Sequence, residues 1–153
     1  MANEERTLII LKPDAVQRRF VGEILGRFER KGLKLIALRM TKLDRTLLER
    51  HYAEHREKPF YSSLLEFMAA GPVVLGVLEG NKAIEVARKM MGKTFAHQAE
   101  PGTIRGDLGV SSQFNLIHGS DSPESARKEI SLFFTEREIC AYSMPDGDWL
   151  LAE

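Results

Sequence analysis

The chain has 153 residues, of which 22 are basic and 22 acidic, and its sequence pI is near 6.9. This length suits one domain with a hydrophobic core, and the balanced charge argues against dedicated nucleic-acid binding, which usually needs a basic excess. The single cysteine excludes an intramolecular disulfide, and no apolar run approaches the roughly 20 residues that span a bilayer, so we expect a cytoplasmic protein without dedicated membrane binding.

The first part of the chain predicts two strands and two of the helices that follow them. Residues 7–12 form a short apolar run typical of a buried strand. Pro13 then opens a helix whose apolar residues recur until Gly32 stops it. Alternating apolar and basic residues predict a second strand at 33–40, and a later apolar stripe predicts a helix at 60–70.

A helix between these elements carries a short pattern that also occurs in metalloproteases. Asp44 can cap this helix, which we expect to continue to His55. The stretch from His51 to His55, HYAEH, matches H-x-x-E-H, the inverted zinc-protease motif. Two histidines four residues apart could bind zinc, but no third ligand stands out, so the sequence favours no metal site.

The second part of the chain predicts two more strands and two more helices. A strand is expected at 73–78, and Asn81 can cap a helix that Gly92 ends. Residues 93–114 have no clear period, and long loops of this kind are often functional. A minimal strand at 115–118 and a helix capped by Ser122, with Pro123 first, follow. Strands alternating with helices predict an α/β sandwich, one small sheet with helices packed on it.

A histidine and a glutamate around the last strand are candidates for catalysis. His118 ends that strand, and Glu129 lies on the buried face of the next helix with Ala126 and Phe133. A carboxylate there needs a partner, and the histidine is about two helical turns away. If the carboxylate holds one ring nitrogen, the other nitrogen is free to attack. The alternative is a structural histidine that caps a turn, which spacing alone favours.

Two further groups of residues suggest a nucleotide. Lys12, Arg88 and Arg105 could bind phosphate oxygens, although no P-loop motif is present. Tyr52, Phe60 and Leu64 could hold a flat base. The alternatives are solvated cations and ordinary core residues, and the sequence alone favours both alternatives.

Four blocks of the sequence resemble the nucleoside diphosphate kinase family and occur in the family's order. They are Leu11-Lys-Pro-Asp-Ala-Val-Gln-Arg18, Gly71-Pro-Val-Val74, Pro101-Gly-Thr-Ile-Arg-Gly-Asp107 and Asn115-Leu-Ile-His-Gly-Ser-Asp-Ser122. The resemblance runs from about Glu5 to Trp149. It implies a single domain over residues 1–153 with a ferredoxin-like βαββαβ fold, in which helices cover a four-stranded antiparallel sheet.

The resemblance also implies the reaction. The γ-phosphate of a nucleoside triphosphate would pass to a nucleoside diphosphate by a ping-pong mechanism, through a phosphohistidine at His118 and with broad base tolerance. Glu129, supported by Ser120, would hold the other ring nitrogen. Tyr52 would line the histidine, and Lys12 would serve the transferred phosphate. Mg²⁺ would arrive mainly on the nucleotide phosphates, with no metal ligands from the chain.

The remaining roles implied by the resemblance concern substrate binding. The residues that would bind phosphate are Arg88, Thr94 and Arg105. The residues that would contact the sugar 3′-hydroxyl are Lys12 and Asn115. The residues that would enclose the base are Phe60, Leu64 and Ser112. The chain departs from the family's pattern at Phe95, Ala96, Ser112 and Phe114, where members often have Asn, Pro, an aliphatic residue and Arg. These differences concern loop packing and base affinity.

The competing function is a non-catalytic ferredoxin-like module that binds a nucleotide as a regulator, but the intact set of site residues favours the enzyme. The resemblance also implies a homohexamer, with a tetramer or dimer as alternatives. The apolar residues Trp149 and Leu150 predict a buried tail. The resemblance favours burial against a neighbouring chain, and the alternative is docking onto the chain's own surface. By the family's pattern, Glu153 would approach the nucleotide base of a neighbour.

Overall fold

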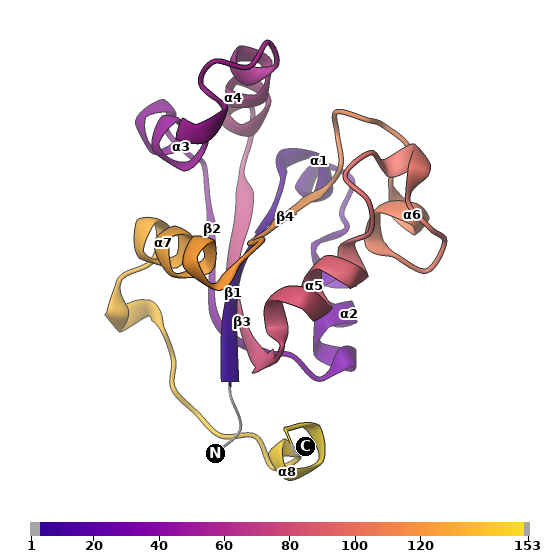
Figure 1. The fold of residues 1–153 in the computed structure, drawn as a ribbon, viewed down its shortest axis with the longest axis vertical. Helices are drawn as coiled ribbons and strands as arrows, with labels where there is room; N and C mark the ends of the chain where they lie inside the picture. Colours follow the sequence, from indigo (N-terminus) through magenta and orange to yellow (C-terminus); the bar gives the residue numbers. More distant parts are fainter. Residues whose placement is uncertain (1–3, 152–153) are drawn as a thin grey trace.

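A four-stranded antiparallel sheet forms the centre of the computed structural model, which describes residues 4–151 (Figure 1). The strands are β1 (Glu4–Leu11), β2 (Lys34–Thr41), β3 (Val73–Asn81) and β4 (Ile117–Gly119). They lie in the order β2-β3-β1-β4, and every neighbouring pair is antiparallel. The predicted ferredoxin-like sheet is therefore confirmed, with β1 in its interior and β4 at one edge.

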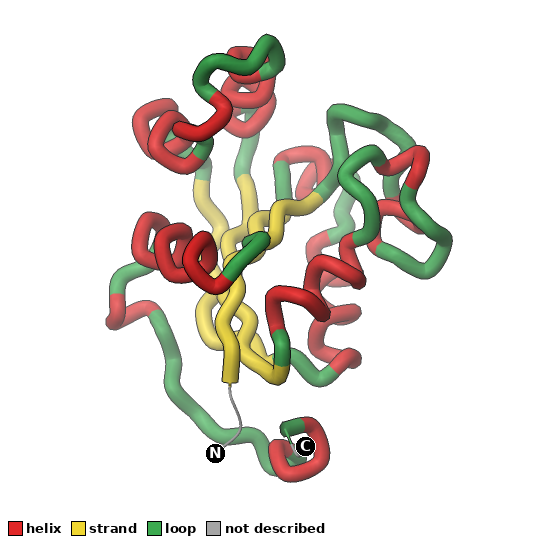
Figure 2. Tube along the Cα trace, viewed as in Figure 1, coloured by secondary structure: helices red, strands yellow, loops and turns green. Residues whose placement is uncertain are grey.

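Alternate side chains of β1 enter two separate cores, because successive residues of a strand point to opposite faces. Leu8 and Ile10 pack with residues of the helices on one face, whereas Ile9 and Leu11 pack with those on the other. The helices of the first face are α3 (Arg45–His51), α4 (Tyr61–Ala69) and α7 (Pro123–Phe133). Those of the second are α1 (Pro13–Gln17), α2 (Val21–Lys31), α5 (Ala83–Met91) and α6 (Ile104–Leu108). Figure 2 shows the sheet between these two groups of helices.

The helix predicted from Pro13 to Gly32 is two helices, so that prediction is wrong in detail. Arg19 lies between α1 and α2 and has a φ of 62°, in the left-handed region that breaks a helix. The second half ends as predicted, at Gly32 in the left-handed conformation.

Two other helix boundaries also differ from the predictions. The Asp44 side chain does cap α3, accepting a hydrogen bond from the Leu47 N–H at 2.8 Å. However, α3 ends at His51, and a separate turn of 3₁₀ helix, η1 (Ala53–His55), follows it. The continuous helix that the zinc motif requires is therefore absent. The predicted cap of α5 is also wrong, since Asn81 ends β3 and Lys82 caps the helix with a φ of 48°.

The long segment before β4 contains structure that the sequence pattern did not predict. It holds the 3₁₀ helix η2 (Ala96–Gln98) and the short helix α6, whose N-terminus is capped by the Thr103 side chain. It ends at Leu116, a non-glycine residue with a φ of 72°. The Leu116 N–H donates to Asp14 Oδ2 at 3.1 Å, which ties this strained residue to α1.

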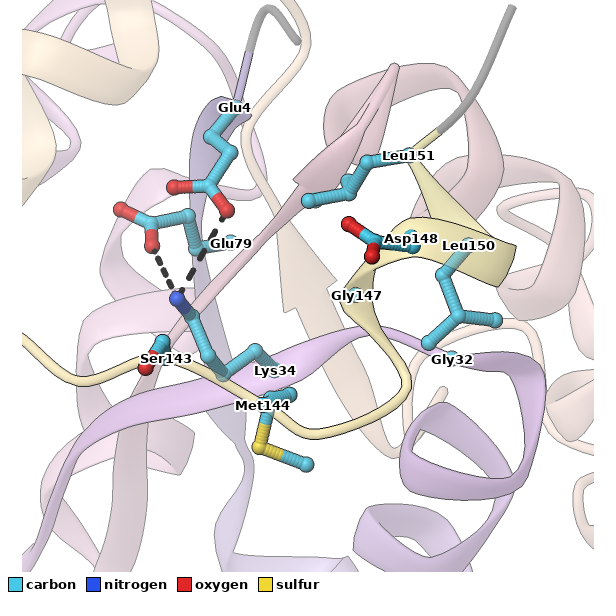
Figure 3. A pocket seen from close by; sticks show the side chains of 11 residues that line it. Glu4, Gly32, Lys34, Glu79, Ser143, Met144, Gly147, Asp148, Leu150 and Leu151 are labelled. Carbon is cyan, nitrogen blue, oxygen red and sulfur yellow. Dashed lines mark ion pairs between the residues drawn. The ribbon is translucent and has the colours of Figure 1, made fainter. Parts of the chain in front are cut away.

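The C-terminal segment crosses the end of the sheet that lies near the N-terminus (Figure 1). After η3 (Glu136–Glu138) it ends in the short helix α8 (Gly147–Leu150). Leu150 lies over Gly32, beside a pocket in which Lys34 bridges Glu4 and Glu79 (Figure 3). Trp149 is 89% exposed, so its predicted burial does not occur on this chain. Glu153 lies outside the described residues. Within residues 4–151, no helix is long and apolar enough to cross a membrane.

Candidate active site

The predicted contact between His118 and Glu129 is present. Pairing of β4 with β1 places the His118 ring beside α7, and its Nε2–H donates to Glu129 Oε1 at 3.0 Å. The side chains are 22% and 17% exposed, so the pair is partly shielded but reachable. Because Nε2 is engaged, the Nδ1 lone pair remains available for reaction.

Ser120 anchors this pair to the centre of the sheet. Its hydroxyl donates to the same Glu129 oxygen at 2.7 Å and accepts from the Leu8 N–H at 3.1 Å. Burial raises the pKa of the Glu129 carboxyl, but the hydrogen bonds from His118 and Ser120 outweigh it. The net pKa lies below its ordinary value, so Glu129 is charged at neutral pH and positioned from two sides.

Lys12 and Asn115 form the second part of the site. Lys12 follows β1 and caps α1, and its Nζ donates to Asn115 Oδ1 at 2.7 Å. The Asn115 amide in turn donates to the Thr94 carbonyl oxygen at 3.0 Å. Burial and the charge of Arg105 lower the pKa of Lys12 to about 8, against an opposing effect of Asp14. The cation is therefore held in a place that disfavours its charge unless an anion arrives.

Arg105 has a structural role that the sequence did not predict. Three of its nitrogens, Nε, Nη1 and Nη2, donate to the carbonyl oxygens of Asn115, Gly92 and Ile117 at 3.0, 3.0 and 2.6 Å. It thereby holds the end of α5 against β4. Burial, and then the charge of Arg88, lower the pKa of Arg105 to about 10, so it stays charged at neutral pH. Arg88 Nη1 donates to the Gly119 carbonyl oxygen at 3.0 Å, so Arg88 and Arg105 both contact β4.

The residues predicted to hold the base lie between the end of α3 and α4, except Ser112. Tyr52 is buried, and its hydroxyl has no hydrogen-bond partner within the part of the chain that the structure describes. Burial is the main cause that raises its pKa. The ring of Phe60 is exposed and lies 5.6 Å, between centroids, from that of His55. Leu64, on α4, is half-buried and packs against the core of the first face. Ser112 is exposed, and its Oγ lies 3.1 Å from His97 Nδ1, within hydrogen-bond distance.

The structure adds His51, which the sequence offered only as part of the zinc motif. Its ring packs edge-to-face against that of His118, with centroids 4.8 Å apart and planes at 86°. Burial and the charge of His118 lower the pKa of His51 to about 3, so the ring stays neutral. No local signal reveals this contact, because it joins α3 to β4 through the fold.

Comparisons with known proteins agree on one family. The model of the family described as nucleoside diphosphate kinase matches residues 5–139. The nucleoside diphosphate kinase of Thermomicrobium roseum is 59% identical over 147 residues, covering 96% of this chain and 99% of that protein. That of Archaeoglobus fulgidus is 52% identical, covering 97% and 99%. A solved structure of a halophilic nucleoside diphosphate kinase from Halobacterium salinarum in complex with CDP superposes with a TM-score of 0.94 at 43% identity, covering 96% and 98%.

Proposed function

The chain belongs to the nucleoside diphosphate kinase family and transfers phosphate between nucleotides, and we propose that it does so through a phosphohistidine at His118. The observation that carries this proposal is the hydrogen bond from Nε2 to Glu129, which leaves Nδ1 free on a strand that the buried residues Lys12 and Arg105 adjoin through Leu116 and Ile117. In the first half-reaction the Nδ1 lone pair attacks the γ-phosphorus, and the bond from phosphorus to the bridging oxygen breaks. The diphosphate leaves, and a second diphosphate reverses the step.

The protein's own groups supply positioning and charge, which carry most of phosphoryl transfer. Glu129 stabilises the positive charge that develops on the His118 ring as the new bond forms. Lys12, Arg88 and Thr94 bind the phosphates, and Lys12 with Asn115 contacts the sugar 3′-hydroxyl. A guanidinium has five N–H groups, so the carbonyl bonds of Arg105 leave donors for a phosphate. Tyr52 lines the histidine.

The base and the magnesium ion need few side chains of the protein for binding. Exposed Phe60 stacks on the base, with Leu64 and Ser112 beside it, and stacking tolerates any base. Mg²⁺ arrives on the nucleotide phosphates. Within residues 4–151, one cluster has three potential metal ligands, and it contains two imidazoles and one carboxylate. Mg²⁺ prefers an oxygen-rich shell, so this cluster does not suit it.

The experiment that tests the proposal is steady-state kinetics with donor and acceptor varied together. One site with one covalent carrier predicts parallel double-reciprocal lines. Incubation with γ-labelled ATP alone should leave an acid-labile, alkali-stable label on the protein. Intersecting lines and an unlabelled protein would instead indicate direct transfer in a ternary complex. A regulatory module would bind nucleotide but give neither turnover nor label.

The lowered pKa of Lys12 predicts a specific pH dependence. Its cation is present below a pH of about 8 and is lost above it, so phosphoenzyme formation should slow as pH rises through about 8. The unfolded chain keeps this proton up to about 10.5, so between these values the unfolded state binds more protons. The contribution of Lys12 to the free energy of unfolding therefore rises with pH, by up to ~1.4 kcal/mol per unit.

Single-turnover rates and thermal unfolding, measured over the same pH range, separate these two effects. A rate that falls while this stability contribution rises excludes unfolding as the cause. The matched variant is Lys12→Gln, which should be slow at every pH and should lack the step near pH 8. If Lys12→Gln shows the same step as the unmodified protein, another group is responsible.

We also propose that the protein assembles as a homohexamer. Strand β2 is an edge of the sheet in the single chain, and its Leu38 and Met40 are 52% and 59% exposed. Natural proteins usually cover such an apolar edge. Trp149, exposed at the C-terminal end, is a second apolar surface for a neighbour.

Light scattering should give a mass near six chains for the full-length protein. Deleting residues 150–153 should lower the mass or make thermal unfolding depend more steeply on protein concentration, because oligomers are stabilised by mass action. A monomeric full-length protein would contradict the assembly. If the truncated protein keeps its mass and stability, the hexamer stands but the tail is not part of its interface.

A further inference from the structure

Three potential metal ligands meet beside the nucleophile. His51 comes from the end of α3, His118 from β4 and Glu129 from α7, and one ligand atom of each lies within 4.8 Å of the others. Within the group, His118 Nε2 and Glu129 Oε1 are already 3.0 Å apart and joined by a hydrogen bond. The group combines residues from three elements, so no linear motif describes it.

His51 contributes a feature that packing alone does not explain. Both of its ring nitrogens are buried without a hydrogen-bond partner among residues 4–151. Its ring also contacts Tyr52 and Phe133, with centroids 4.4 and 5.2 Å away. A phenylalanine could fill such an aromatic position without leaving buried polar atoms unpaired, which is unfavourable. The imidazole therefore keeps a free lone pair, and one His51 nitrogen lies within 4.8 Å of a ligand atom of both His118 and Glu129.

We propose that His51, His118 and Glu129 bind a borderline-soft divalent transition-metal ion of the Zn²⁺ class, and that this ion inhibits the enzyme. Two imidazoles and one carboxylate, with water in a fourth position, form a common zinc ligand set. Zinc–ligand bonds of about 2.0–2.1 Å require the donor atoms to approach to about 3.3 Å. A side-chain movement of about 1.5 Å by His51 closes the separation of up to 4.8 Å to that range. The partial exposure of His118 leaves an entry path.

Metal binding changes the chemistry of His118 without touching the phosphate ligands. The ion binds Nε2 of the other tautomer: the proton leaves Nε2 and, through the solvent, Nδ1 takes one up, so the ring stays neutral, and the Glu129 carboxylate binds the ion instead of the Nε2 proton. Nδ1 then carries the ring proton and has no lone pair with which to attack the γ-phosphorus. Since Lys12, Arg88 and Asn115 are not in the group, turnover should fall while nucleotide affinity is retained. This inhibitory effect rests on the proposed function, whereas the binding itself does not.

The test begins with metal-free protein in the absence of nucleotide. Calorimetric titration with Zn²⁺ should give one ion per chain, and Co²⁺ should give the visible absorption of a tetrahedral centre. His51→Phe keeps an aromatic ring but removes the ligand, so it should weaken Zn²⁺ binding by about 100-fold or more, since losing a residue that only orients a ligand already costs about 10–100-fold. Glu129→Gln removes a second ligand and should weaken binding as well. Thermal unfolding checks that each variant is folded.

His55→Phe is the matched control, because His55 belongs to the linear zinc motif but not to this spatial group. It should retain Zn²⁺ binding. If His51→Phe and Glu129→Gln bind Zn²⁺ as tightly as the unmodified protein, or if the unmodified protein binds none, the metal site is wrong. If the protein binds Zn²⁺ as described but forms no phosphohistidine, the proposed function is refuted and the proposed metal site still stands. At a buffered free Zn²⁺ concentration, unchanged turnover would refute the inhibition.

Discussion

Replacing His118 with alanine should abolish the phosphoenzyme and lower turnover by on the order of 10⁴-fold or more, because no other group can carry the phosphate. ADP binding should change little, since the proposed phosphate and base ligands lie on other elements. The measurements are γ-labelled ATP incorporation, turnover and calorimetric ADP affinity. His97→Ala is the matched control, because His97 is exposed in the loop before β4 and pairs with Ser112. Normal turnover of His118→Ala would refute its assignment as the nucleophile.

Replacing Glu129 with glutamine should lower turnover by about 100-fold, or about 2.7 kcal/mol, and leave ADP affinity nearly unchanged. Glutamine can still accept a hydrogen bond from the His118 ring, but it cannot stabilise positive charge on it. The carboxylate is charged at neutral pH, since its pKa is lower than usual, so this charge is lost in the variant. An effect on the transition state appears in the rate rather than in ground-state binding.

Rapid-quench measurement of phosphoenzyme formation, with calorimetric ADP affinity, checks this expectation. Glu124→Gln is the matched control, because it makes the same change at an exposed position of the same helix. If Glu129→Gln loses ADP affinity but forms the phosphoenzyme at the normal rate, Glu129 belongs to the binding site. Its pairing with His118 would then have no catalytic role.

The parts of the site that could be predicted from the residues alone are those made by neighbours along the chain. His118 and Glu129 are 11 positions apart, and a strand followed by a capped helix brings them together. Lys12 and Asn115 are 103 positions apart, so only the family resemblance linked them. The sheet order that joins such distant residues cannot be read from periodicity, which describes one element at a time.

Three other features depended on the fold in ways that residue type does not reveal. Arg105 was predicted as a cation near phosphate, but its bonds to three carbonyl oxygens require the positions of α5 and β4. The zinc motif pairs His51 with His55. In the structure α3 ends at His51, and its ring contacts that of His118. Arg19 and Lys82 adopt a left-handed backbone conformation without being glycine. The helix boundaries beside them therefore carry no sequence signal from which they could be predicted.

The interior position of β1 has a consequence for biosynthesis. This strand is made first, but its two partners, β3 and β4, begin only at residues 73 and 117. At a synthesis rate of about 5–20 residues per second, β1 remains without either partner for several seconds. Its apolar run is then open to chaperones or to the edges of other nascent chains. The bond from Leu8 to Ser120 spans 112 positions, so the machinery around His118 assembles only when nearly the whole chain has left the ribosome.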